Sequence, residues 1–130
     1  MLEGSCDCGK VRWTFTGAPE SATACNCTLC RRYGALWLYG HENEDIYLSG
    51  PTRTYLRGER VLEFHFCPDC GCIAWWRGGK PGDDGRRHIG VNARLAAPET
   101  VAALAINHFD GLESWQRLPR DGRCVADMWF

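Results

Sequence analysis

Hydrophobic and polar residues alternate along several short segments of the chain. In residues 10–16, Val11, Trp13 and Phe15 alternate with more polar neighbours, which is the pattern of a strand with one buried face. Similar short apolar segments predict further strands at residues 35–39, 46–48, 52–57, 60–66, 72–77 and 88–95. Residues 58–59 are expected to form the hairpin turn between two of these strands. The pattern predicts a mainly β protein.

Only residues 98–105 have helical character, because Pro98 suits a first helical turn, and an extended edge segment is the alternative reading. No linker, charge block or repeat interrupts the chain, so we expect one domain over residues 1–130. The tail, residues 117–130, lacks clear periodicity but ends in an apolar Met-Trp-Phe sequence. We expect this tail to pack on the body or on a second subunit of a homodimer.

Composition and charge narrow the function classes. With 45% hydrophobic and 24% charged residues, the chain has globular proportions rather than those of a disordered protein. The formal net charge is −1, whereas proteins that bind nucleic-acid phosphates usually carry a basic excess. The sequence also contains neither a long apolar run nor the features of a signal peptide. We therefore expect a soluble cytoplasmic protein without a nucleic-acid or membrane partner.

The 9 cysteines are the strongest chemical signal. Their odd number and the lack of a secretory signal argue against a disulfide framework. Two pairs with only one residue between the cysteines would also form strained disulfides. Tetrahedral zinc, with Zn–S bonds of ~2.3 Å, needs sulfurs within about 4 Å of one another, which closely spaced cysteines provide. Iron–sulfur clusters also bind four thiolates, but these spacings match none of their familiar motifs.

The cysteine clusters separate into two metal sites. The outer pairs, Cys6 with Cys8 and Cys67 with Cys70, join naturally into one closed site with four cysteines. The middle trio has three thiols and no obvious fourth ligand; its members are Cys25, Cys27 and Cys30. Structural zinc sites are usually closed, while catalytic sites keep one position open. The sequence leaves open whether the second site is closed by Cys72, Cys124, His65 or His108.

Some polar residues near the trio are candidates for substrate binding. Arg31 and Arg32 directly follow the trio and could bind carboxylates, although solvated surface charges are the alternative. His108 precedes the Asp110–Gly111 turn and could line the same pocket. Four tryptophans could form pocket walls, but core packing is the favoured interpretation for Trp13, Trp37, Trp75 and Trp76.

The cysteine motifs resemble those of the glutathione-dependent formaldehyde-activating enzyme family, which also includes centromere protein V. The resemblance covers roughly residues 4–116 and is carried by residues 4–11, 25–34, 64–71, 91–94 and 110–111. One departure is Thr28, where many members have Ser, but the hydroxyl is kept. Cys72 and Cys124 are additional to the family pattern.

The resemblance implies a β-tent fold, built from small antiparallel sheets around zinc–cysteine clusters. It implies two zinc ions per chain: a structural one held by the outer pairs and a catalytic one held by the trio. The implied reaction combines glutathione with formaldehyde to give S-hydroxymethylglutathione, and the reverse direction is a carbon–sulfur lyase. The alternative is a non-catalytic zinc module for protein contacts. If the chain is an enzyme, we expect a deep pocket over the trio; if it is such a module, we expect a sealed second site.

Overall fold

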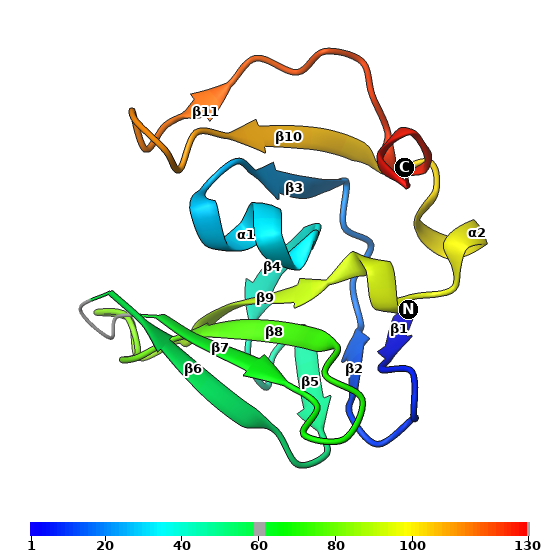
Figure 1. Cartoon of the computed structure of the whole chain (residues 1–130), viewed down its shortest axis with the longest axis vertical. Helices are drawn as coiled ribbons and strands as arrows, with labels where there is room; N and C mark the ends of the chain where they lie inside the picture. The colour runs from blue at the N-terminus through cyan, green and yellow to red at the C-terminus, as the bar shows by residue number, and fades with distance from the viewer. Residues whose placement is uncertain (59–61, 130) are drawn as a thin grey trace.

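The computed structural model describes residues 1–58 and 62–129, and its chain is mostly β (Figure 1). The strands are β1 (Leu2–Ser5), β2 (Arg12–Phe15), β3 (Ser21–Cys25), β4 (Trp37–His41), β5 (Ile46–Ser49), β6 (Arg53–Arg57), β7 (Leu62–Phe66), β8 (Ile73–Gly78), β9 (His88–Asn92), β10 (Ala105–Phe109) and β11 (Arg117–Leu118). The short helices are α1 (Thr28–Tyr33), α2 (Pro98–Val101), η1 (Ala93–Leu95) and η2 (Val125–Met128). The predicted mainly β class is confirmed.

The strands form a three-stranded sheet, in the order β1-β2-β5, and an eight-stranded sheet, in the order β11-β10-β3-β4-β9-β8-β7-β6. Neighbouring strands are antiparallel apart from β3 and β10, which run parallel with Cys25 beside Phe109. In Figure 1, β10 and β11 lie at one end of the molecule and β6, β7 and β8 lie toward the other, with α1 between them. The larger sheet therefore links both sides of the region around α1.

Most expected strands are present, and two predicted elements, one strand and one helix, end earlier than expected. The predicted strand at residues 88–95 stops at Asn92, whose side chain accepts the N–H of Arg94 at 3.1 Å and begins a 3-10 turn. The expected helix at 98–105 ends at Val101, because Ala105 starts the strand that pairs with β3. Part of the expected turn at 58–59 and the start of the strand at 60–66 lie outside the described residues.

The main core lies where the two sheets face each other, and it holds Trp13, Leu38, Ile46, Trp75, Val91 and Ile106 with other apolar side chains. A second hydrophobic cluster includes residues of α1 and the side chains packed against it. Its buried members are Cys27, Cys30, Ala35, Trp37, Phe64 and Ile73. The cysteines of the trio are thus anchored in packed hydrophobic surroundings. Burial of each large apolar side chain contributes roughly 1.5–3 kcal/mol to folding.

The described part of the C-terminal tail packs on its own chain. Val125 is fully buried, and its N–H donates to the carbonyl of Leu104 at 2.9 Å. The Arg94 guanidinium also contacts the carbonyl oxygen of Met128. Phe130, the last residue of the apolar end, lies outside the described residues. None of the helices in the described ranges has the length and apolar character that crossing a membrane requires.

Candidate metal centre

The two outer cysteine pairs meet in space. The thiol sulfurs of Cys6, Cys8, Cys67 and Cys70 lie within 4.8 Å of one another. Sγ of Cys8 is 3.6 Å from Sγ of Cys6 and 3.6 Å from Sγ of Cys67. Ligand sulfurs of a tetrahedral zinc site lie about 3.8 Å apart, because each Zn–S bond is about 2.3 Å long. The spacing and the all-sulfur donor set suit a closed zinc site.

Two tight turns shape this four-cysteine cluster. Gly9 and Gly71 have φ angles of 84° and 78°, which favour glycine. Their N–H groups donate to the carbonyls of Cys6 and Cys67 at 3.1 and 2.9 Å. The N–H of Val11 donates to Sγ of Cys6 at 3.3 Å. Each turn folds a cysteine pair onto one side of the backbone, so the loop after β1 meets the loop after β7.

The middle trio lies where β3 passes into α1. Cys25 ends β3, Cys27 is the N-cap residue of α1, and Cys30 lies within the helix. Their sulfurs also lie within 4.8 Å of one another. Backbone N–H groups donate to the sulfurs of Cys25 and Cys27 at 3.5 and 3.3 Å, and the indole of Trp37 donates to Sγ of Cys30 at 3.4 Å. Such donors stabilise the thiolate form that binds metals.

Arg57 supplies a positive charge to the trio. It ends β6, and its Nη1 donates to Sγ of Cys27 at 3.1 Å. The pKa of Cys25 is lowered to about 6, first by a hydrogen bond from the Cys30 thiol and further by the N–H of Cys27 and the charge of Arg57. The same thiol pairing raises the pKa of Cys30. The trio therefore carries negative charge at neutral pH, which favours a bound cation.

A loop after β10 packs directly on the trio. Oδ1 of Asn26 accepts the N–H of Gly111 at 2.8 Å, and Nδ2 of Asn26 donates to Asp110 at 3.2 Å. A Cβ on residue 111 would lie only 2.8 Å from both Sγ of Cys25 and Cβ of Cys27. A side chain at residue 111 would force the loop or the trio to shift, so glycine allows this close approach.

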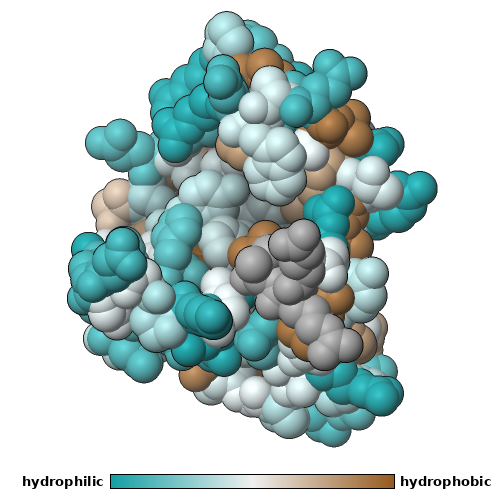
Figure 2. Space-filling model, turned by 90° about the vertical axis from the view of Figure 1, so that its left-hand side faces the viewer, coloured by the Kyte–Doolittle hydropathy of each residue, from teal (hydrophilic) through white to brown (hydrophobic). Residues whose placement is uncertain are grey.

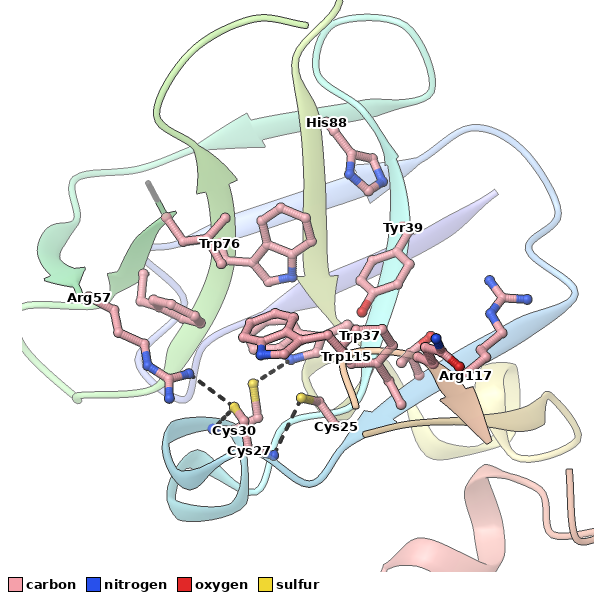
Figure 3. A pocket seen from close by; sticks show the side chains of 15 residues that line it. Cys25, Cys27, Cys30, Trp37, Tyr39, Arg57, Trp76, His88, Trp115 and Arg117 are labelled. Atoms are coloured by element: carbon pink, nitrogen blue, oxygen red, sulfur yellow. Dashed lines mark hydrogen bonds between the residues drawn. The ribbon is translucent and has the colours of Figure 1, made fainter. Parts of the chain in front are cut away.

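A cavity of about 660 Å³ opens over the trio (Figure 3). Figure 2 shows the corresponding face of the molecule, which is hollowed near its centre. The cavity walls are largely aromatic: Trp37, Tyr39, Phe64, Trp76, Phe109 and Trp115. Its polar lining is formed by Thr23, Arg57, His88, Gln116 and Arg117. Of the tryptophans expected in the core, Trp13 and Trp75 lie there, whereas Trp37 and Trp76 also face this cavity.

Within the described ranges, no fourth His, Cys, Asp or Glu side chain joins the trio. His65 hydrogen-bonds to Thr52 at 2.8 Å, and His108 contacts Asp121 at 3.1 Å. Cys124 donates to Asp127 at 3.3 Å. Cys72 instead packs against the main core next to the other cluster, where its carbonyl accepts the N–H of Cys67 at 3.0 Å. The four side chains considered for closing the second site are thus engaged elsewhere, and the trio faces the cavity.

The structure places the three candidate substrate-binding residues outside the described cavity lining. Nε of Arg31 donates to the carbonyl of Asn26 at 2.8 Å, and Arg32 donates to the carbonyl of Thr28 at 2.9 Å, so both guanidinium groups bind backbone carbonyls near the start of α1. His108 alternates with Phe109 along β10, and only the phenylalanine side chain faces the cavity. Two other arginines, at positions 57 and 117, line the cavity. No local motif connects these arginines to the trio.

Tyr39 was also missed by motif reasoning. Its ring lies edge-on to Trp76 and His88, with centroid distances of 5.6 and 5.5 Å. Its hydroxyl points toward the trio (Figure 3). Tyr39 keeps 36% of its surface exposed, but desolvation of its hydroxyl inside the cavity raises the pKa of Tyr39 to about 12. The phenol therefore remains protonated at neutral pH and can donate a hydrogen bond inside the cavity.

Comparisons with known proteins agree with this arrangement. A curated Halomonas elongata protein named "Putative glutathione-dependent formaldehyde-activating enzyme" is 30% identical over 90 residues, which cover 58% of this chain and 55% of that protein. The chain thus spans about half the length of that relative. A Rhodobacter sphaeroides protein of known crystal structure shares the fold, with a TM-score of 0.57 and 24% identity over 72% of this chain and 85% of that one. The sequence profile of the glutathione-dependent formaldehyde-activating enzyme family matches residues 1–104, and the chain belongs to this family.

Proposed function

We propose that this chain catalyses the reversible addition of a thiol to an aldehyde, with glutathione and formaldehyde giving S-hydroxymethylglutathione as the pair that the family suggests. In the opposite direction it acts as a carbon–sulfur lyase. The observation that carries the proposal is the placement of Cys25, Cys27 and Cys30 at the wall of an open cavity of about 660 Å³. Three ligands beside an open cavity are typical of a catalytic metal site.

Zinc is the metal that best fits both clusters, because every donor is a cysteine sulfur and the sulfurs are spaced for tetrahedral coordination. We assign a structural zinc to Cys6, Cys8, Cys67 and Cys70. A second zinc held by the trio would supply an open coordination position and ionise the substrate thiol. Such thiol chemistry requires reduced cysteines, which supports a cytoplasmic location.

The protein side chains contribute orientation and electrostatics. In the addition, the thiolate sulfur forms a bond to the aldehyde carbon, and the carbonyl π electrons move to oxygen, which then takes a proton. The hydroxyl of Tyr39 donates a hydrogen bond to this oxygen as its negative charge develops. Arg57 offsets the charge of the trio through its contact with Cys27. The aromatic walls hold the reactants together and exclude water.

The alternative function is a zinc module that binds proteins and has a sealed second site. That function requires a fourth side chain over the trio, and the described residues contain none within reach. A zinc module of this kind also has no need for a cavity of this size beside the trio. The open cavity therefore favours the enzyme.

The test is the exchange between free formaldehyde and S-hydroxymethylglutathione at equilibrium, measured by two-dimensional NMR. The exchange rate in the same mixture without protein gives the spontaneous reaction, and the difference between the two rates gives catalysis. We expect the zinc-loaded protein to accelerate the exchange and Cys27→Ser to abolish the acceleration. Cys124→Ser, which removes a thiol outside both clusters, is the matched control and keeps the activity. No acceleration by fully loaded protein, with this adduct or other thiol–aldehyde adducts, would refute the proposal.

A further inference from the structure

Trp115 has an unusual conformation at the cavity. Its φ angle is 56°, in the left-handed region that bulky side chains rarely adopt. Its side chain is 65% exposed, although it lines the cavity and lies edge-on to Phe109 at a centroid distance of 5.8 Å. Backbone strain together with an exposed indole is unfavourable for folding. Such features often mark a residue positioned for ligand binding.

Trp115 is held firmly in this position. Its N–H donates to the carbonyl of Asp110 at 2.8 Å. The Asp110 carboxylate accepts the N–H groups of Glu113 and Ser114 at 3.2 and 3.1 Å, and these contacts, with Ser114 first, hold the pKa of Asp110 well below its usual range. Asn26 ties the same carboxylate to the trio. The indole is therefore presented by a loop that is fixed to the metal-binding residues.

The cavity is more aromatic than glutathione and formaldehyde require. Its volume of about 660 Å³ must also hold the thiol partner, but glutathione is a polar peptide and formaldehyde adds a single carbon, so neither accounts for the aromatic lining. Trp37, Phe64 and Trp76 line it together with Trp115. Flat aromatic walls gain most from contact with another flat apolar group. Arg117 lines the same cavity and could pair with a carboxylate of the thiol partner.

We propose that the site prefers thiol–aldehyde adducts in which the aldehyde-derived group is a flat, apolar ring that packs against Trp115. This inference rests on the proposed function, because the sulfur of the adduct has to lie beside the three cysteines of the trio. The reaction is R–SH + Ar–CHO ⇌ R–S–CH(OH)–Ar. The C–S bond forms, the carbonyl π pair moves to oxygen, and the thiol proton ends on that oxygen. No oxidant or reductant is needed.

Stable thioethers test this preference without turnover. Binding of S-benzylglutathione and S-methylglutathione to the zinc-loaded protein is compared by isothermal titration calorimetry. The two ligands share the peptide and differ only in the ring. Burial of the ring predicts an affinity at least about tenfold higher for the benzyl compound.

Variants show whether Trp115 carries this gain. Trp115→Gly should reduce the benzyl-to-methyl ratio to less than about threefold, because it removes the indole; glycine tolerates the positive φ, so the fold is kept. Trp115→Phe restores a flat ring and should keep most of the ratio. Trp129→Ala is the control, because Trp129 is 37% exposed and lines a different cavity.

Two results would overturn the preference: equal affinity of the wild-type protein for both ligands, or an unchanged ratio in Trp115→Gly. Absence of binding by either ligand would overturn it as well. The formaldehyde exchange assay is independent of these titrations. If exchange is accelerated while the two ligands bind equally, the proposed function stands and only the aryl preference fails.

Discussion

Nη1 of Arg57 donates a hydrogen bond of 3.1 Å to Sγ of Cys27, and this contact joins the edge strand β6 to the N-terminus of α1 (Figure 3). It places a guanidinium charge beside three clustered thiols. Hydrogen bonds from charged donors are shorter and stronger than neutral ones. The charge of Arg57 therefore lowers the free-energy cost of ionising the thiols of the trio.

The reactivity of Cys25 should report this arrangement in reduced, metal-free protein. A lowered pKa leaves the thiolate in place at lower pH, so alkylation by iodoacetamide should show a midpoint near pH 6, compared with the ordinary value of 9.0. Arg57→Gln removes a positive charge and should raise this midpoint. Mass spectrometry of the modified peptide gives the rates. Arg53→Gln, an exposed arginine of the same strand, should leave the midpoint unchanged; an unchanged midpoint in Arg57→Gln would contradict the electrostatic role.

The two proposed zinc sites should differ in their effect on folding. Cys67→Ser removes a buried ligand of the four-cysteine cluster and should lower the free energy of unfolding by on the order of 5 kcal/mol or more, because structural zinc binding is coupled to folding. Cys27→Ser should remove one metal ion and keep the fold. Metal analysis and denaturant titration measure both effects, with Cys124→Ser as the control. Equal losses of stability in the first two variants would argue against separate structural and catalytic sites.

Gly111→Ala should disturb the trio by steric contact. The added methyl group would lie 2.8 Å from Sγ of Cys25, so the loop after β10 must shift. We expect weaker metal binding by the trio and a loss of about 1–3 kcal/mol in stability. Competition with a chromophoric chelator measures the affinity. Gly78→Ala is the matched control, since its nearest contact would be 3.6 Å away; equal behaviour of the two variants would show that the loop does not restrain the trio.

Tyr39→Phe should affect the rate of reaction rather than substrate binding. It removes the hydroxyl that faces the trio and keeps the ring. Loss of one donor to a developing oxyanion typically lowers kcat by about 100-fold, and KM should stay within about twofold. NMR exchange rates at several substrate concentrations separate the two parameters. Tyr47→Phe, whose hydroxyl donates to the carbonyl of Glu44 at 3.2 Å on the surface, should retain full activity. A normal kcat in Tyr39→Phe would exclude the proposed donor.

Much of the fold could be predicted because several strands have clear apolar segments. β3 was missed because its sequence, Ser-Ala-Thr-Ala-Cys, consists of small residues without strong alternation. α1 was missed because its N-cap is Cys27 rather than Ser, Thr, Asp or Asn. Arg31 and Arg32 followed by Gly34, with a φ of 66°, form a C-terminal signal that could have revealed this helix.

The two cysteine clusters could be identified from the amino-acid sequence, because the cysteines within each pair or trio are close along the chain and the two outer pairs each precede a glycine. The surroundings of the trio, in contrast, depend on the folded chain. Arg57, Tyr39 and Trp115 come from three separate parts of the chain, and strand pairing across the larger sheet brings them to one cavity. Such long-range pairing depends on the register of all intervening strands, and no local pattern encodes it. The cysteines that we propose as metal ligands were therefore visible in the sequence, whereas the cavity beside the trio was not.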